Sequence, residues 1–538
     1  MSGKLTIGRR TVLRYAGAGA VSAILAGCVG DEEPDPNEEE DEEAEDSDGA
    51  SDEASDPDEE GITVVQDAIG TTLDPHAHRE AVTTRTLSQT YEGLIRRDRD
   101  AEIIAVLATD YERVDDETVR FEIREDVEFH DGSELTPEDV AYSIRRMVDP
   151  DVGIASPQAD QLSGVVGAEV TDDGAVDVLM DTVNPAVFSL FAAYMTVVSE
   201  EWVESRDPDE VATDMNGTGP YRIEEYEEDV ELSLTRFEGY WDDEPAIPAV
   251  TFQGQPETST RYSALAAGEA DFITDLHPDD APSVEDDPER RVDSSPATRI
   301  VYVAMRYDVE PFDSVEFRQA MNYAIDLEAI IESVLSGFGE PTSQPSMEGF
   351  FGFNPDLDPY PYDPDRAAEL VSESGYTDVD IELHTPIGDV FGDVEVAQAA
   401  AGYIDELEGV SCEVQQREFG SLVDELLDGD IETSPEMYLI SWGNATFETS
   451  AIAMPPLSST GAITSFSDEG VDDLFAQAEA EPDLDEREEL YFEINERLHE
   501  LAPWVFLHQH YNIYGIDERI EWEPRIDEQI YVREMGLR

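Results

Sequence analysis

The sequence predicts an α/β protein of two or three domains that follow an N-terminal segment of different composition. The chain has 538 residues, 40% of them hydrophobic, which is too long for one core at the usual size of about 100 to 200 residues per domain. Apolar and polar residues alternate over 118–124, as in a half-buried strand. Thr136, Pro137 and Asp139 then form a capping box, and an apolar stripe follows them as far as Met147. This unit of strand, turn and capped helix is typical of an α/β domain.

The first 28 residues read as an export signal. Arg9 and Arg10 form a twin-arginine string, and the apolar run over 15–26 is too short to span a membrane comfortably. The string Leu25-Ala26-Gly27-Cys28 resembles a lipobox, in which the cysteine sulfur receives a lipid. We therefore expect residues 1–28 to be a twin-arginine lipoprotein signal with Cys28 as the site of lipidation.

Residues 29–60 are predicted to be a disordered acidic tether. From Asp31 to Glu60 the sequence consists almost entirely of Asp, Glu, Ser, Pro and Ala, so it has too little apolar surface to offset the entropy lost on folding. A lipid at Cys28 followed by such a spacer holds a folded body near a membrane surface. The expected location is extracytoplasmic, on the outer face of the cell membrane.

The charge of the chain indicates a protein adapted to concentrated salt. Its formal net charge is −98, from 129 acidic and 31 basic residues, and Lys4 is the only lysine. Molar salt shortens the Debye length to about 3 Å and screens this repulsion. A surface for one basic partner is a weaker explanation, because acidic residues are spread over the whole chain. Nucleic-acid binding is excluded, since the sequence offers no basic patch to neutralise phosphates.

Capped helices and strands are predicted in order along the rest of the chain. They are a strand at 62–65, a helix capped by Asp313 with Glu316 at its third position, a helix from Asp326 to Leu335 closed by Gly337, a helix from Asp363 to Gly375, and a buried strand at 501–507.

Several strings in this order resemble the extracellular solute-binding proteins of family 5, the peptide, dipeptide and nickel receptors of ABC importers. The strings are Thr72-Leu73-Asp74-Pro75-His76, Tyr91-Glu92-Gly93-Leu94, Phe129-His130-Asp131-Gly132 with Thr136 to Ser143, Gly217-Thr218-Gly219-Pro220-Tyr221, and Phe317-Arg318-Gln319-Ala320-Met321-Asn322-Tyr323-Ala324-Ile325-Asp326. The resemblance extends from about residue 61 to residue 537.

The resemblance implies a two-lobed periplasmic-binding-protein-like fold of class II type, with an extra subdomain in the first lobe and a two-stranded hinge. Residues 61–250 are expected to form the first lobe, 251–500 the second, and 501–538 the return to the first. The chain is then expected to cross between lobes near Val250 and near Leu507. The implied function is to capture a peptide or related small solute between the lobes and to deliver it to the permease and ATPase subunits of an ABC importer. Hinge closure around the ligand provides the mechanism.

The string from Tyr438 to Glu448 is the predicted wall of the ligand cleft, because a buried strand ends there in Trp and small polar residues. A role for Trp442 in the core alone is the alternative. The predicted ligand contacts are Trp442, Asn444, Ala445, Thr446, Phe447 and Glu448, together with His76 and Tyr91.

In the family that this string resembles, the first Asp of a Trp-x-x-Asp-x-x-Asp-Pro segment meets the free amino group of a peptide. Ala445 stands at that position and Glu448 at the second Asp. A buried ammonium group without a carboxylate partner costs several kcal/mol. Either Glu448 or another acid therefore replaces the missing Asp, or the ligand lacks a free amine, as a modified peptide or a neutral oligosaccharide does.

No catalytic residue and no cofactor is predicted. The usual nucleophile, phosphate-loop and metalloprotease signatures are absent, and only Cys28 and Cys412 are available as cysteines. The mature chain has no lysine for a Schiff base. A secreted, surface-anchored hydrolase with two carboxylates remains an alternative, as does a structural surface lipoprotein. We expect Cys412 to be buried and unreactive.

Two histidine pairs raise the question of a metal. His76 with His78, and His508 with His510, are each spaced by two residues, which on a strand places both rings on one face. Each pair needs a third ligand, and we predict no resident metal. A receptor for a metal complex remains a further alternative for the function.

Overall fold

The computed structural model describes residues 61–152, 154, 156–427 and 431–538. The predictions for the twin-arginine string, for Cys28 and for the acidic tether lie outside these residues. The described residues from Gly61 onwards belong to one compact unit, the folded body. Within the described part of the chain, no helix combines the length and the apolar character that a membrane span requires.

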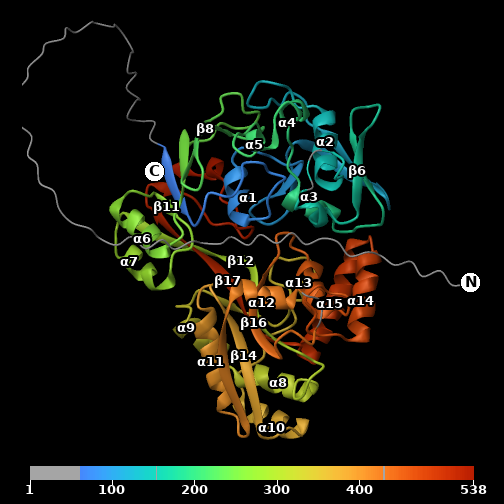
Figure 1. Cartoon of the computed structure of the whole chain (residues 1–538), viewed down its shortest axis with the longest axis vertical. Helices are drawn as coiled ribbons and strands as arrows, with labels where there is room; N and C mark the ends of the chain where they lie inside the picture. Colours follow the sequence, from blue (N-terminus) through green and yellow to red (C-terminus); the bar gives the residue numbers. More distant parts are fainter. Residues whose placement is uncertain (1–60, 153, 155, 428–430) are drawn as a thin grey trace, which may run out of the picture. The chain divides into compact units, whose positions relative to one another are not determined.

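A mixed sheet of eleven strands runs through the folded body (Figure 1). Its strand order is β15-β14-β16-β12-β17-β11-β1-β10-β9-β8, and β13 pairs with β17 at the side. The bounds are β1 Ile62–Gln66, β8 Tyr221–Glu227, β9 Glu231–Arg236, β10 Ala249–Gly254, β11 Phe272–Ile273, β12 Arg290–Met305, β13 Glu340–Pro341, β14 Val379–Ile387, β15 Val410–Glu418, β16 Met437–Gly443 and β17 Trp504–Asp517.

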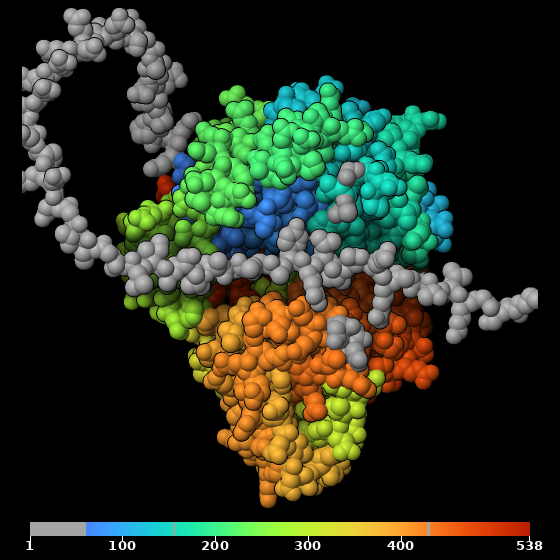
Figure 2. Space-filling view, in the orientation of Figure 1, coloured from blue at the N-terminus to red at the C-terminus, as the bar shows by residue number. Residues whose placement is uncertain are grey.

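The buried side chains divide the body into two lobes. Three hydrophobic cores draw all their buried members from residues 62–284 and 513–535, and we call these segments the first lobe. Two further cores draw theirs from residues 300–507, which form the second lobe. In Figure 2 the blue-to-green surface of the first lobe lies in the upper part of the view and the yellow-to-orange surface of the second lobe in the lower part.

Two long strands, β12 and β17, belong to both lobes. Arg290 to Pro296 of β12 pair with the carboxyl-terminal half of β17, and Ile300 to Ala304 pair with its amino-terminal half. The register shifts between Pro296 and Ile300, where the Gln509 side-chain amide donates to the Ala297 carbonyl at 2.8 Å. The chain therefore passes between the lobes at about 297–299 and 509–510.

This placement corrects one expected boundary. Val250 lies inside the first-lobe sheet, where it is paired with Ile62 of β1 and Leu234 of β9. Residues 251–284, which we expected to begin the second lobe, pack with the first because β10, β11 and the helices after them bury their apolar side chains there. The first crossing therefore comes almost 50 residues after Val250, whereas the second lies within a few residues of Leu507.

The first lobe has a subdomain built on a separate four-stranded sheet, β4-β5-β7-β6. The helix that the sequence predicts after Thr136 is α2, and both hydrogen bonds of the expected capping box are present. Strand β5 coincides with the predicted strand at 118–124. The subdomain elements are β2 Ile95–Arg97, β3 Ile103–Ala105, β4 Ala108–Asp115, β5 Thr118–Ile123, α2 Pro137–Val148, η1 Ala159–Leu162, β6 Val165–Val170, β7 Val176–Met180 and α3 Val187–Tyr194.

Short helices and a terminal hairpin complete the first lobe. They are α1 Ala81–Leu87, α4 Glu200–Glu204, α5 Pro208–Val211, α6 Thr258–Ala267, η2 Pro278–Asp280, α7 Ala281–Glu285, β18 Ile520–Glu521, η3 Val532–Glu534 and β19 Gly536–Leu537. Strand β18 pairs with β19, and Trp522, Ile530 and Val532 of the carboxyl-terminal segment are buried in a core of the first lobe.

The second lobe covers its part of the sheet with helices, and one predicted cap is wrong by a residue. Ser314, not Asp313, caps α8, because its hydroxyl accepts from the backbone N–H of Phe317. Asp313 instead accepts from the Tyr376 hydroxyl. The caps predicted at Asp326 and Asp363 are confirmed. The helices are α8 Val315–Ala324, α9 Leu327–Ser333, α10 Pro364–Ser374, α11 Asp393–Asp405, α12 Phe419–Leu426, α13 Thr449–Leu457, α14 Glu469–Ala480 and α15 Leu484–Leu501.

Candidate ligand-binding cleft

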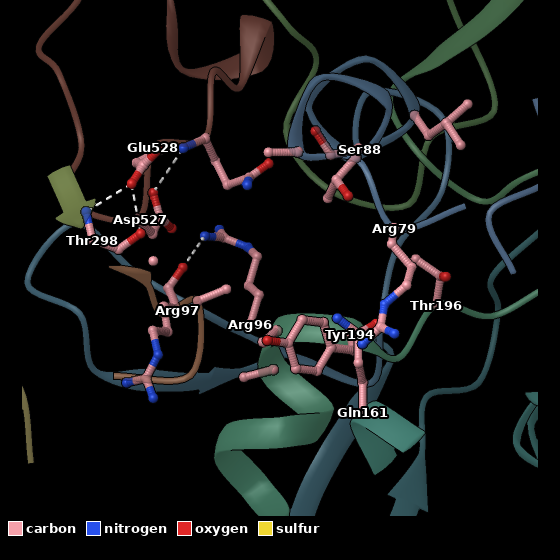
Figure 3. Close-up of a pocket in the computed structure, with 18 of the residues that line it drawn as sticks. Arg79, Ser88, Arg96, Arg97, Gln161, Tyr194, Thr196, Thr298, Asp527 and Glu528 are labelled. Atoms are coloured by element: carbon pink, nitrogen blue, oxygen red, sulfur yellow. Dashed lines mark hydrogen bonds between the residues drawn. The ribbon is translucent and has the colours of Figure 1, made fainter. Parts of the chain in front are cut away.

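A cavity of about 540 Å³ lies where the two lobes meet. The first lobe contributes residues around α1 and β2, the end of α3 and the segment 527–533, and the second lobe contributes the end of β16 with the loop after it. Thr298 and Arg299 also line the cavity, at the point where β12 passes between the lobes. A solute in this space therefore touches both lobes and one crossing strand. Figure 3 shows part of the cavity lining.

The structure places four of the eight predicted ligand contacts on the wall of this cleft: Tyr91, Trp442, Asn444 and Ala445. The Trp442 indole N–H donates to the Ala451 carbonyl at 3.0 Å, so its ring alone remains for a ligand. The Asn444 amide holds its own loop, because it donates to the Glu448 carbonyl and accepts from Thr446. The predicted strand end thus supplies an apolar wall rather than polar ligand contacts.

His76 lies behind the cleft wall rather than in it. Its ring is fully buried, with Nε2 at 3.0 Å from the Thr196 carbonyl oxygen and Nδ1 at 3.0 Å from an Arg146 nitrogen. Burial and the Arg146 charge lower the pKa of His76 to about 4, so the ring is neutral at pH 7. Arg146 also forms a buried ion pair with Asp74 at 2.6 Å. The Thr72-to-His76 string therefore anchors a loop in the first lobe.

Glu448 is committed to a buried ion pair and does not line the cavity. Its carboxylate is bound by the Arg487 guanidinium of α15 and accepts a hydrogen bond from the Ser189 hydroxyl of α3 at 2.9 Å. Burial opposes the charge on Arg487, but the Glu448 carboxylate and the Tyr491 hydroxyl together raise the pKa of Arg487. The proposal that Glu448 receives a ligand ammonium is therefore wrong, because both oxygens already have partners.

Thr446 and Phe447 join Glu448 in a contact between the lobes. Arg97 of β2 donates to the Thr446 carbonyl at 2.6 Å, and its guanidinium carbon lies 4.5 Å from the centre of the Phe447 ring. Phe447 has a positive φ of 60°, which is costly for an aromatic residue and occurs where the surroundings enforce it. We call Arg97, Ser189, Thr446, Phe447 and Glu448 the interlobe contact.

The cleft gathers positive charge in a strongly acidic protein. Five arginines line it, Arg79, Arg96, Arg97, Arg299 and Arg533, against four acids, Glu92, Asp389, Asp527 and Glu528. Over the whole chain, acids outnumber basic residues by 129 to 31. Basic residues therefore outnumber acidic residues in the cleft lining, which is the opposite of their ratio in the whole chain.

The four acids are also bound to partners within the protein. Glu92 accepts from Tyr240, Trp241 and Thr218, and its burial raises the pKa despite these bonds and the nearby Arg533. Asp527 accepts two hydrogen bonds from Arg525. In Figure 3, Glu528 accepts from both the backbone N–H and the hydroxyl of Thr298, at 2.7 and 2.5 Å. Asp389 accepts from the Ser441 backbone at 2.8 Å.

Arg299 projects from the crossing strand along the floor of the cleft. Its guanidinium donates to the Ser441 hydroxyl at 2.7 Å and lies 3.9 Å from Asp389. A side chain at Gly443 would bring its Cβ within 3.1 Å of Arg299 Nη2. The glycine after Trp442 therefore makes room for this arginine.

The sequence interpretation missed all five arginines. One sequence signal for a positive cleft was present, because Arg96 and Arg97 are adjacent cations in a chain where acidic residues predominate. Its significance depends on the fold, since β2, the crossing strand and the carboxyl-terminal segment meet only in three dimensions.

His508 and Cys412 lie in the protein interior, whereas His78 borders the cleft and His510 is half-buried. His508 is buried at the lobe crossing, and burial with the neighbouring His510 lowers its pKa to about 3. His78 lines the cleft, and burial lowers its pKa. No group of three or more His, Cys, Asp or Glu side chains suitable for a metal occurs among the described residues. Cys412 is buried in β15, as predicted, and burial raises the pKa of its thiol.

The two-lobed α/β fold with a cavity at the lobe junction defines a solute-binding protein. The family model for bacterial extracellular solute-binding proteins, family 5, matches residues 102–463. This match covers more than half of the chain, and the protein belongs to that family.

Named relatives agree with the assignment. The chain is 27% identical over 461 residues to the glutathione-binding protein GsiB of Pectobacterium atrosepticum, with 82% of this chain and 87% of that protein covered. It is 28% identical over 314 residues to heme-binding protein A of Haemophilus influenzae, with 54% and 57% covered.

Solved structures confirm the predicted two-lobed fold. HbpA2 of Haemophilus parasuis matches with a TM-score of 0.80 at 20% identity, covering 89% of this chain and 99% of that one. A dipeptide-binding protein of Pseudoalteromonas sp. SM9913, in complex with Met-Leu, matches with a TM-score of 0.73 at 21% identity, covering 89% and 100%.

Proposed function

We propose that this protein captures a peptide or related small solute in the interlobe cleft and delivers it to the permease and ATPase of an ABC importer. The observation that carries the proposal is the position of the cavity, which lies at the junction of the two lobes beside the irregularity in β12. A ligand that contacts both lobes stabilises the closed arrangement, because only that arrangement offers all its contacts at once. Relatives named for glutathione and for a dipeptide support a peptide-like ligand.

The cellular setting of the proposal rests on the sequence. The twin arginines and the lipobox-like string ending at Cys28 favour export and a lipid anchor on the outer face of the membrane. The net charge of −98 favours an environment of molar salt. Both features suit a receptor that collects solute outside the cell for a membrane partner.

The direct test is to identify the bound solute and to show that it is not converted. Protein purified in molar salt is denatured, the released molecules are identified by mass spectrometry, and each one is added back to ligand-free protein. A bound solute at 100 times its Kd stabilises the folded state by about 2.7 kcal/mol, which a thermal melt detects. Stabilisation with full recovery of the added solute supports a receptor.

The same experiment separates the alternatives. A hydrolase releases a product from the added solute, so the appearance of fragments would contradict the proposal. A structural surface lipoprotein carries no solute and shows no stabilisation by any probe. Recovery of a metal complex would identify a different ligand for the same cleft.

A further inference from the structure

Two separate sets of contacts join the lobes through side chains of the protein itself. The first is the interlobe contact, in which the Ser189 hydroxyl of α3 donates to the Glu448 carboxylate at 2.9 Å and Arg97 donates to the Thr446 carbonyl at 2.6 Å. Arg97 also donates to the Ser189 hydroxyl at 3.3 Å. Ser189, Thr446 and Glu448 are buried. These bonds therefore connect the lobes at a place shielded from water, where hydrogen bonds to charged groups are strong.

The second set of contacts comes from other elements. His277, at the start of η2 in the first lobe, packs edge-on against Phe391, which lies just before α11 in the second lobe, with ring centres 4.5 Å apart. Phe338 of the second lobe is partly buried against the first-lobe core that contains Leu276. We call His277, Phe338 and Phe391 the aromatic contact. None of these three residues is part of the cavity lining, so the aromatic contact is independent of the surface that a solute touches.

The second lobe holds its half of the interlobe contact in position by itself. The Asn444 side chain accepts from the backbone N–H and the hydroxyl of Thr446, at 2.8 and 2.7 Å, and donates to the Glu448 carbonyl at 2.6 Å. The Phe447 carbonyl accepts from the backbone N–H of Phe351 at 2.9 Å. All these partners belong to one lobe, so the loop needs no partner from the other lobe to take this shape. Closure of the lobes therefore costs little conformational entropy at this contact.

We propose that the interlobe contact and the aromatic contact together form a latch that holds the lobes closed before a solute binds. This inference rests on the proposed function, because it concerns access to the same cleft. Every donor, acceptor and ring of the latch belongs to the chain, so the latch forms without a solute. A hydrogen bond to a charged group shifts an equilibrium by about ten- to hundredfold, and an aromatic pair shifts it by about two- to tenfold. Both shifts favour the closed arrangement.

Such a latch affects the kinetics of capture more than the affinity. Its contacts favour closure in the free and in the loaded protein alike, so their contributions to the affinity largely cancel. Association has to wait for a spontaneous opening of the lobes, which lowers the association rate in proportion to the open fraction. Dissociation is slowed for the same reason. The latch therefore makes the receptor slow to load and slow to lose its solute.

The test measures the separation of the lobes without any solute. Val166→Cys in β6 and Ala476→Cys in α14 place spin labels at exposed positions of the first and second lobes. Cys28 is replaced by Ser, and Cys412 is buried. The protein is unfolded in urea and refolded in molar salt, mass spectrometry verifies that it carries no solute, and double electron–electron resonance gives the distances between the labels.

The latch is weakened by Ser189→Ala, by His277→Ala and by both substitutions together, none of which changes a residue of the cavity lining. Ser263→Ala is the matched control, because the Ser263 hydroxyl donates to the Ser259 carbonyl within α6 and is exposed. A thermal melt of each variant verifies folding. Because the two substitutions lie in different contacts, each one tests the latch independently of the other.

We expect one main distance for the solute-free wild-type protein, in agreement with the separation of the two positions in the structure. Ser189→Ala should raise the open population about tenfold, and His277→Ala by a smaller factor. The double variant should be mainly open, with a longer main distance, whereas Ser263→Ala should keep the wild-type distribution.

Two outcomes overturn the inference: a solute-free wild-type protein that already shows the longer distance, or a double variant that keeps the short distance. Neither outcome contradicts the receptor function, because the measurement contains no solute. The proposed function fails separately, when no solute is recovered from the native protein and no added solute stabilises it.

Discussion

The buried ion pair between Glu448 and Arg487 gives the sharpest test of how the second lobe is built. Replacing Glu448 by Gln keeps the shape of the side chain and an oxygen for Ser189, but removes the negative charge. Arg487, whose side chain is 3% exposed, then loses its ion-pair partner and keeps its contacts with the Tyr491 and Phe351 rings, whose centres lie 5.3 and 4.8 Å away.

The expected cost follows from this burial. Breaking a buried ion pair by removing one partner destabilises a protein by about 3 to 5 kcal/mol. The hydrogen bond from Ser189 and the two aromatic rings remain in Glu448→Gln, so we expect the lower end, about 3 kcal/mol. The matched control is Glu369→Gln in the exposed pair with Arg366, for which we expect about 0 to 1 kcal/mol.

Urea unfolding in molar salt, followed by tryptophan fluorescence, measures both variants. The variants are compared by the urea concentration at which half of the protein is unfolded. This comparison requires that the free energy of unfolding depends on urea concentration with the same slope in each variant, since a change in slope signals that the lobes no longer unfold together. If Glu448→Gln unfolded like the wild-type protein but bound peptides with a free amine more than a hundredfold less tightly, Glu448 would be a ligand contact and the structural role would be refuted.

Four further predictions concern pH, the interlobe contact, the anchor and salt. The pKa of His76 lies at about 4 in the folded protein against 6.5 for the free side chain, so its contribution to stability is present above about pH 6.5 and is lost as the pH falls towards 4. His76→Gln should therefore flatten the fall in melting temperature between these values, and an unchanged slope would contradict the buried neutral ring. Arg97→Met removes the bond to Thr446 and the contact with Phe447, and should increase the radius of gyration of the ligand-free protein in small-angle scattering. An unchanged radius would show that other contacts hold the lobes together. Cys28→Ser should release the protein from membranes into the medium, whereas persistent membrane attachment after a salt wash would argue against the lipid. The melting temperature should fall as salt decreases from molar to about 0.1 M, where the Debye length is about 10 Å, and a flat profile would remove the argument from net charge.

Local signals in the sequence determined much of the framework. The capping box at Thr136 and Asp139, and the caps at Asp326 and Asp363, involve residues three positions apart, so the sequence alone carries the information. The same holds for strand β5, whose alternation is a property of neighbouring residues. The family resemblance, which depends on several such strings in order, led to the two-lobed fold.

Boundaries and polar contacts needed the tertiary structure. The sequence indicates that a strand begins near Val250, but only pairing with β1 and β9 shows that it stays in the first lobe. Glu448 looked available for a ligand because Arg487, 39 residues later, reaches it only when α15 packs against the loop. A carboxylate in sequence has no fixed partner, since its charge is satisfied by whichever cation the fold brings near.

The chemistry of the cleft was decided in the same way. Composition determined that the protein as a whole is strongly acidic, and it predicted neither the sign nor the position of charge in the cavity. Arg96, Arg299 and Arg533 come from three distant parts of the chain, and no local sequence pattern links them. They form one positive lining because β2, the crossing strand β12 and the carboxyl-terminal segment converge at the lobe junction, and electrostatic interactions depend on distance in space rather than on separation in sequence.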